Sequence, residues 1–448
     1  MKKILTFATA AFVLLSSVLV TAQDFKIKLQ EIFGKNNVIS IDSSAFKEYY
    51  QIKIPQLINH DDPNSAIFSQ QVLLGIADPA APTVMQTEGY AIPKNYNDPH
   101  YKTELTTLLN ANQILVEHRF FGESIPDPNS KKFLTYEQAA RDHHQIKEKL
   151  KTFLTGKWLS TGVSKSGDAA LAYRFFYPSD VDATVAYGIS LTTHQEEPGI
   201  EKFINEKMKT SDGQKIQKIQ LHLLQNKTKF LPVFKKIMTF NNKDISGWDA
   251  EVLYDYNVLD LQNSFWQYYK SYDDLVAEIN FIVDEELKRD GFTIDIPMEK
   301  IEDRMLFFAT FMGMGSTDEK MKSHYYQAFS QGGHYGYDET PFRKYLKLKD
   351  YPLNIYAGEH TIFKKEFREV EKKWTETEME KVIFINGSND PWAVAKIVPN
   401  PKKDNLQIII KDANHTLKIK DLPAEDYKSV VNKLNKWLDL KPEINSHK

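Results

Sequence analysis

A serine between two glycines is the residue of this chain best suited to act as a nucleophile. The segment Gly162-Val-Ser-Lys-Ser-Gly167 follows an apolar run that starts at Trp158 and precedes a helix-compatible run that starts at Asp168. A serine on a sharp turn between a strand and a helix is exposed for attack on a carbonyl, and the usual pattern is Gly-x-Ser-x-Gly. Small neighbours matter because larger side chains obstruct so tight a turn. Ser166 stands where the second glycine is expected, so the segment alone also fits an ordinary strand-to-helix turn.

Serine is a weak nucleophile, and it needs a base that is itself oriented by a carboxylate. Asp390 lies in a glycine-containing turn after the apolar run 381–386, and His415 lies in a second turn after the run 406–410. Catalytic groups of open α/β sheets gather at the carboxyl ends of the strands. Taken singly, an aspartate before a proline is a common turn former, and one of 12 histidines falls near a strand end by chance. The ordered set favours a catalytic triad of Ser164, Asp390 and His415.

The segments that must position these residues alternate between strand-like and helical patterns. We predict helices over 136–154 and 164–176, and strands over 67–76, 83–87, 113–120, 158–161 and 181–191. Strand–helix alternation favours a mostly parallel sheet covered on both faces. The sequence therefore predicts an α/β fold.

The middle of the chain has a different character. From about 196 to 375 it is rich in Lys, Glu, Asp, Tyr and Phe, has helical periodicity and contains few strand-like runs. The closing strands need a sheet to join, so an insertion is favoured over two separate domains. We predict an α/β-hydrolase fold with a helical cap inserted between the nucleophile half and the Asp/His half. The expected boundaries are a signal peptide over 1–22, the first half over 23–195, the cap over 196–375 and the second half over 376–448.

The N-terminal sequence and the composition limit where the protein is expected to be located and which partners it is expected to have. Met1-Lys-Lys, an apolar run to Val20 and the small-x-small pattern before Gln23 have the form of a cleavable signal peptide. The chain contains no cysteine, which excludes a thiolate nucleophile, a disulfide and a lipid-bearing cysteine at the cleavage site. No other segment is long and apolar enough to span a bilayer. A net charge of −3 gives no electrostatic reason to expect a nucleic acid partner. We therefore expect a secreted or periplasmic protein with no membrane anchor after cleavage.

Four sequence blocks resemble those of a known peptidase family. They are Glu117-His-Arg-Phe-Phe-Gly-Glu-Ser124, Gly162-Val-Ser-Lys-Ser-Gly167, Asn386-Gly-Ser-Asn-Asp-Pro-Trp392 and Asn414-His415. They are similar to peptidase family S37, the PS-10 or prolyl tripeptidyl aminopeptidase-like peptidases, which is related to serine peptidase family S28. Lys165 favours S37, because S28 members usually have Tyr after the serine. The S37 elbow reads Gly-Gly-Ser-Lys-Gly-Gly, so this chain departs from it at Val163 and Ser166.

The resemblance implies a secreted serine peptidase that hydrolyses short peptides from a free N-terminus, often after proline, through an acyl-enzyme and with no metal or other cofactor. It implies Ser164 as nucleophile, His415 as general base and later acid, and Asp390 as the group that orients the imidazole. The oxyanion hole is expected to use the backbone N–H groups of Lys165 and Tyr90.

An exopeptidase also needs an acidic group for the substrate amine. Glu88 and Glu123 are the substrate-binding candidates, with Glu302 and Asp303 as further choices. A capped esterase or lipase, and an inactive hydrolase-fold binding protein, remain alternatives.

Three further groups have both a functional and a structural explanation. Glu117, His118 and Arg119 could bind substrate, although a buried ion-pair network is favoured. His144 and Glu148 share a helix face, but one such pair falls far short of a metal site. The loop 332–337 is either part of the pocket lining or a surface loop.

Overall fold

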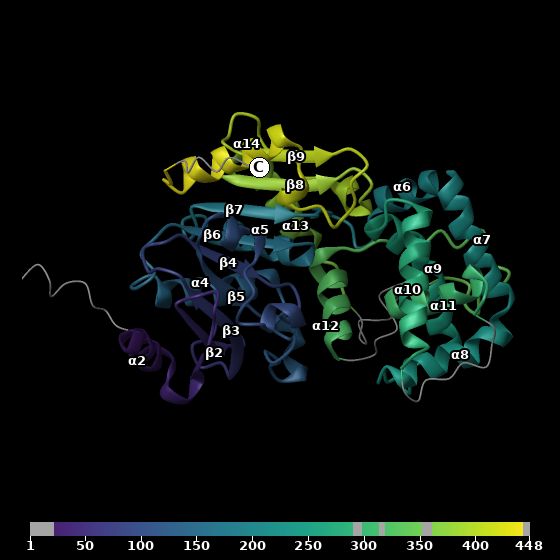
Figure 1. Ribbon diagram of the computed structural model, residues 1–448, viewed down its shortest axis with the longest axis horizontal. Helices are drawn as coiled ribbons and strands as arrows, with labels where there is room; N and C mark the ends of the chain where they lie inside the picture. The colour runs from purple at the N-terminus through teal and green to yellow at the C-terminus, as the bar shows by residue number, and fades with distance from the viewer. Residues whose placement is uncertain (1–21, 290–297, 313–318, 352–360, 442–448) are drawn as a thin grey trace, which may run out of the picture.

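A single nine-stranded sheet forms the centre of the protein (Figure 1). The computed structural model describes residues 22–289, 298–312, 319–351 and 361–441. The order across the sheet is β1-β2-β3-β5-β4-β6-β7-β8-β9. Their bounds are β1 Val38–Ile41, β2 Glu48–Leu57, β3 Ile67–Ile76, β4 Thr83–Thr87, β5 Asn112–Val116, β6 Trp158–Val163, β7 Ala183–Tyr187, β8 Val382–Gly387 and β9 Leu406–Ile410.

The sheet combines an antiparallel edge with a parallel body. The first three strands and the β3–β5 pair are antiparallel, whereas every pairing from β5 through β9 is parallel. Strands β4 to β8 are buried almost throughout, as expected for parallel strands covered on both faces. With helices between the parallel strands, this arrangement is the α/β-hydrolase fold, which confirms the predicted fold class.

Helices cover both faces of the sheet. On one face, α2 (Ala22–Phe33), α4 (Tyr136–Leu150) and α5 (Lys165–Phe176) bury an apolar cluster against the strands. On the other face, α3 (Glu104–Leu108) and α14 (Ala424–Trp437) bury a second cluster. The carboxyl ends of β6, β8 and β9 are thereby fixed between two cores, which gives the turns after them a rigid base.

The chain between β7 and β8 leaves the sheet and builds a helical cap with its own core (Figure 1). The cap helices are α6 (Pro198–Met208), α7 (Ser211–Gln225), α8 (Lys227–Phe240), α9 (Ala250–Tyr268), α10 (Tyr272–Glu286), α11 (Ile301–Met312) and α12 (Glu319–Gln327). Helix α9 is buried over nearly its whole length, so it is the central element of the cap. The helix that follows the cap, α13 (Lys365–Thr377), packs against α5 of the sheet domain.

Three predicted elements end earlier than expected. The strand predicted over 181–191 spans only Ala183–Tyr187, and the chain turns at Gly188, whose φ is 55°. The strand predicted over 113–120 stops at Val116, because the chain turns at Phe120, whose φ is 69°, and at Gly122, whose φ is 57°. The helix predicted to reach residue 154 ends at Leu150.

Nearly all of the predicted signal peptide lies outside the described residues, and α2 starts at Ala22. Within the described ranges, no helix combines the length and apolar character needed to cross a bilayer.

Candidate active site

Ser164 occupies a strained turn between β6 and α5. Its φ of 58° and ψ of −131° lie in a region that L-residues rarely adopt, and its N–H donates to Tyr187 O at 2.8 Å. A Cβ on Gly162 would lie 2.2 Å from the backbone of Ser166, and one on Gly167 would lie 2.5 Å from Ile189 Cγ2. Both glycines are therefore required by the close packing of strand and helix, as the Gly-x-Ser pattern predicts.

Ser166, which replaces the second expected glycine, does not disturb this turn. Its side chain points toward the loop after β4, where Oγ accepts the N–H of Gly89 at 2.9 Å and donates to Glu88 Oε2 at 3.0 Å. Thr87 Oγ1 also donates to the Ser166 carbonyl, at 3.1 Å. The substitution therefore adds hydrogen bonds to the neighbouring loop, and the turn geometry is kept.

Asp390 and His415 meet at the carboxyl ends of β8 and β9. His415 Nδ1 lies 2.7 Å from Asp390 Oδ2, and both side chains are buried. The other Asp390 oxygen accepts the N–H of Trp392 at 3.0 Å, which fixes the carboxylate in one orientation. His415 Nε2 is buried and has no hydrogen-bond partner among the described residues. An imidazole with one nitrogen held by a carboxylate and the other free is arranged to accept a proton.

Gly188 connects this pair with the serine turn. It follows β7 and lines the same small cavity as Ser164, and its φ is 55°. A Cβ there would lie 2.9 Å from His415 Cε1 and Nδ1. Only a glycine lets the imidazole lie so close to the chain at the end of β7. Sequence reasoning missed Gly188, although its position directly after a parallel strand was a usable signal.

The end of cap helix α9 is hydrogen-bonded to the segment that carries His415. The His415 N–H donates to Gln267 O at 3.0 Å, and Asn414 Nδ2 donates to Tyr268 O at 2.7 Å. The Tyr268 ring also lies edge-on to the imidazole, with centroids 6.1 Å apart. The end of α9 thus positions the loop that carries His415.

The two expected oxyanion donors lie on either side of the cavity. Lys165 is the first residue of α5, so its N–H has no partner within the helix. Among the described residues, the N–H of Tyr90 likewise has no hydrogen-bond acceptor. Both residues line the cavity together with Ser164.

The two predicted substrate-binding carboxylates do not line this cavity. Glu88 is 4% exposed, accepts bonds from Gln86 and Ser166, and has its pKa raised by burial to about 7. Glu123 lies on the surface with its carboxylate 3.6 Å from Lys53. The other two choices belong to the cap, where Asp303 pairs with His222 and Lys229. The sequence therefore supplied candidate carboxylates for the substrate amine without showing where their side chains point.

The cavity beside Ser164 has a volume of about 60 Å³ and aromatic walls. The sheet domain contributes Tyr90, Tyr136 and Trp392, and the cap contributes His324 and the 332–334 part of the glycine-rich loop. The pocket-lining interpretation of that loop is therefore confirmed. A larger groove of about 1020 Å³ lies against α3 and α14, and Ser164 does not line it.

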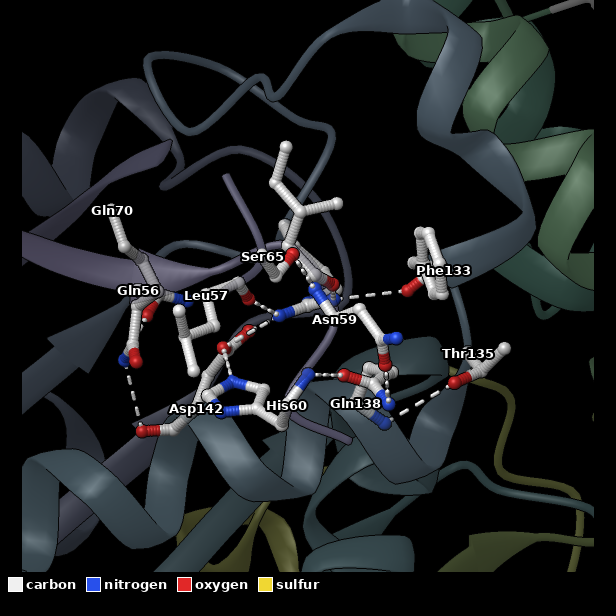
Figure 2. A network of polar contacts seen from close by, with 12 residues as sticks. Gln56, Leu57, Asn59, His60, Ser65, Gln70, Phe133, Thr135, Gln138 and Asp142 are labelled. Carbon is white, nitrogen blue, oxygen red and sulfur yellow. Dashed lines mark hydrogen bonds and ion pairs between the residues drawn. The ribbon is translucent and has the colours of Figure 1, made fainter. Parts of the chain in front are cut away.

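The block Glu117-His118-Arg119 forms the buried network that was favoured from sequence. Arg119 makes two 2.7 Å bonds to Asp142, and it also donates to the carbonyls of Leu57, Ile58 and Phe133. Figure 2 shows Asp142 together with His60, whose Nε2 lies 2.7 Å from Asp142 Oδ1. This network fixes α4 against the loops that follow β2 and β5.

The remaining polar cluster also uses its groups internally. His144, Glu148 and Asp180 bring their ligand atoms within 4.8 Å of one another. However, His144 Nδ1 bonds to Asp180 at 2.7 Å, and Glu148 pairs with Lys151 and Lys147. These contacts are those of a surface ion-pair network.

Comparisons with known proteins agree with these blocks. The PS-10 peptidase S37 family profile matches residues 20–445. A prolyl tri/tetrapeptidyl aminopeptidase of Streptomyces mobaraensis is 25% identical over 474 residues, covering 99% of this chain and 93% of that protein.

Solved structures with a similar fold include two hydrolases. A carboxyl esterase from Bacillus coagulans is 12% identical, with a TM-score of 0.38, over 87% of this chain and 99% of that one. A proline iminopeptidase from Mycobacterium smegmatis is 12% identical, with a TM-score of 0.37, over 86% of this chain and 98% of that one. Because the family profile spans nearly the whole sequence, including the serine turn and the Asp390–His415 pair, this chain belongs to the S37 peptidase family.

Proposed function

We propose that this protein is a serine peptidase that releases short peptides from a free N-terminus, with a preference for proline at the cleavage point. One observation carries the proposal. His415 is bonded to Asp390 through Nδ1, keeps a buried and unpaired Nε2, and lies against Gly188 beside the strained Ser164. This arrangement supports nucleophilic catalysis at an acyl carbon.

The proposed reaction follows from these contacts. Ser164 Oγ attacks the substrate carbonyl while its proton passes to His415 Nε2, and Asp390 stabilises the imidazolium through Nδ1–H. The carbonyl oxygen, now negative, accepts the N–H groups of Lys165 and Tyr90. Collapse of this intermediate transfers the proton from His415 to the leaving amine and forms an acyl-enzyme. Water, activated by the same imidazole, then releases the peptide acid and restores the serine.

The shape of the site supports action on chain ends. The cavity beside Ser164 has a volume of about 60 Å³, and His324 of α12 and the loop 332–334 of the cap line it, so a long chain has little room there. Its Tyr90, Tyr136 and Trp392 walls suit a compact apolar ring such as that of proline. The similar Streptomyces enzyme is by name a prolyl tri/tetrapeptidyl aminopeptidase, which agrees with this substrate class.

The test combines one substitution with one product analysis. Ser164→Ala should reduce hydrolysis of proline-containing peptide amides to background, because the proposed reaction needs the Ser164 hydroxyl as its nucleophile. Ser160→Ala is the matched control, since the hydroxyl of this buried serine of β6 bonds to Thr184 within the sheet. Undiminished turnover by Ser164→Ala would refute the proposal.

Mass spectrometry of products from a peptide library with free and blocked N-termini tests the substrate class. Release of short peptides from free termini alone, with proline at the new carboxyl end, is expected. Cleavage of fatty acyl esters with no peptide cleavage would instead assign an esterase, and failure of a fluorophosphonate to label Ser164 would assign an inactive binding protein.

We further propose that the protein is exported and that a signal peptide is removed before Gln23. The support is the charged, apolar and small-residue order of the N-terminal sequence. N-terminal sequencing of the mature protein from the cell envelope and from the medium tests this cleavage, and an intact Met1 there would contradict it.

A further inference from the structure

The loop that carries one oxyanion donor is tied to the rest of the fold at several points. This oxyanion loop, residues 88–92, follows β4. The carbonyl of Tyr90 accepts the N–H of His118 at 3.1 Å, and the N–H of Ile92 donates to Glu117 Oε1 at 3.2 Å. The block after β5 therefore holds the second half of the loop.

The first half is held by the two residues that directly follow the nucleophile. Ser166 Oγ accepts the N–H of Gly89 at 2.9 Å, and Lys165 Nζ donates to the carbonyl of Gly89 at 2.6 Å. The backbones approach so closely that a Cβ on Gly89 would lie 2.7 Å from the carbonyl carbon of Lys165. Both polar groups of Gly89 are thus fixed to the start of α5.

Fixing the Gly89 carbonyl also fixes the direction of the Tyr90 N–H. The two belong to one planar peptide unit, and no cis peptide bond occurs in the described part of the chain. In a trans peptide the C=O and the N–H point in opposite directions. Because Lys165 Nζ binds the oxygen on one side, the N–H is directed to the other side, and it is the group that has no acceptor. A donor bound to the carbonyl also polarises the peptide and strengthens its N–H as a donor.

The surroundings of Lys165 hold its amine in the contact with the Gly89 carbonyl. The side chain is 9% exposed, and Nζ lies 4.1 Å from the ring centroid of Phe121 and 4.8 Å from that of Tyr90. Burial lowers the pKa of Lys165 well below its ordinary value, and the nearby Asp168 offsets only part of this effect. Either protonation state of the amine can donate to a carbonyl, so the contact does not depend on the charge.

We propose that Lys165 and Ser166 are positioning residues whose side chains clamp Gly89 by its carbonyl and its N–H, and so aim the N–H of Tyr90 at the oxygen of the substrate carbonyl as that oxygen becomes negative. The proposal rests on the acyl-transfer function proposed for Ser164. It gives Ser166, which departs from the S37 pattern, a defined part in the reaction. It also gives Lys165 two roles: the side chain positions Gly89, and the backbone N–H contacts the oxyanion directly.

Two substitutions test the clamp. Lys165→Met removes the donor to Gly89 while it keeps the apolar stem between Phe121 and Tyr90. Ser166→Ala removes the acceptor of the Gly89 N–H with little change in volume. The matched controls are Lys149→Met, since Lys149 also lies over an aromatic ring, and Ser160→Ala.

The decisive readout separates transition-state binding from substrate binding. A peptide aldehyde forms a hemiacetal with Ser164 whose oxygen occupies the oxyanion position. Lys165→Met should lower kcat about 100-fold and leave KM within about threefold. It should weaken the binding of the aldehyde by the same factor by which it lowers kcat/KM. Ser166→Ala should show the same pattern at about tenfold, and the control variants should match the wild type.

The double variant supplies a second criterion. Because both side chains hold the same residue, Gly89, the loss in kcat of the double variant should be smaller than the product of the two single losses. Unchanged aldehyde affinity in both single variants, or a rise in KM that accounts for the whole loss, would overturn the clamp. If Lys165→Met does not fold, Ser166→Ala alone decides by the same criterion. An active Ser164→Ala would instead overturn the proposed function, whereas an inactive Ser164→Ala beside wild-type clamp variants would overturn the clamp alone.

Discussion

Glu88 should make this protein lose stability as the pH rises from about 4.5 to about 7. Its carboxyl is buried, and burial raises its pKa from 4.5 to about 7, although Gln86 and Ser166 bond to it. The folded state therefore holds the proton more tightly than the unfolded chain does. Below about pH 4.5 both states are protonated, and Glu88 adds no pH dependence.

Between about pH 4.5 and pH 7 the unfolded chain ionises Glu88 while the folded protein keeps it protonated, so the free energy of unfolding falls. One pKa unit corresponds to about 1.4 kcal/mol, so the full effect above pH 7 is about 3 kcal/mol. Glu88→Gln removes this titration, and its amide can still bond to Ser166. The stability of the variant relative to the wild type should therefore increase by about 3 kcal/mol from pH 4.5 to pH 8.

Urea unfolding at several pH values measures this difference, because subtracting the two proteins cancels the groups that titrate in both. Glu123→Gln on the surface is the matched control, and its difference from the wild type should vary by less than about 0.5 kcal/mol over the same range. Parallel stability curves for wild type and Glu88→Gln would refute the assignment of a raised pKa to this buried carboxyl.

Three other substitutions probe the site and its supports. Asp390→Asn should lower kcat/KM for prolyl peptide amides by about 10⁴-fold with the fold intact, because the imidazole of His415 loses its orienting carboxylate; a small effect in steady-state kinetics would argue against the triad. Gly188→Ala should lower kcat by about 100-fold, because the new methyl group pushes the His415 ring away, and a wild-type rate of fluorophosphonate labelling would contradict this. Arg368→Met should cost about 3–5 kcal/mol in urea unfolding, because it leaves the Asp168 and Glu371 carboxylates without their buried partner; a loss below about 1 kcal/mol would show that the ion pairs are dispensable.

The parts of the site that sequence predicted are those fixed by local geometry. Ser164 follows β6 directly, Asp390 and His415 lie in the turns after β8 and β9, and parallel strands place their carboxyl ends at one edge of the sheet. The helical insertion was also recognisable, because its periodicity differs from that of the strands on either side. The antiparallel β2 was missed, although Tyr50, Ile52 and Ile54 alternate with polar residues as in a half-buried strand.

The roles of buried polar residues depended on partners that sequence does not reveal. Glu88 was one of four acidic candidates for the amine anchor, but its carboxylate turns toward Ser166, which is 78 positions later in the chain. Likewise Gly188 owes its importance to the ring of His415, which arrives from the other end of the sequence. Such contacts follow from packing of distant elements, and no local pattern encodes them.

Ser166 shows how a departure from a family pattern can be read. A glycine at this position serves a tight turn by being small, and the turn here needs that property at Gly162 and Gly167, where a Cβ would collide with backbone or a side chain. At position 166 the side chain instead points toward the neighbouring loop and meets Gly89 and Glu88 at bonding distance. A glycine there would leave the N–H of Gly89 without its acceptor and the buried Glu88 without one of its donors, so Ser166 and Glu88 should be treated as a coupled pair, and each substitution should be measured in the background of the other.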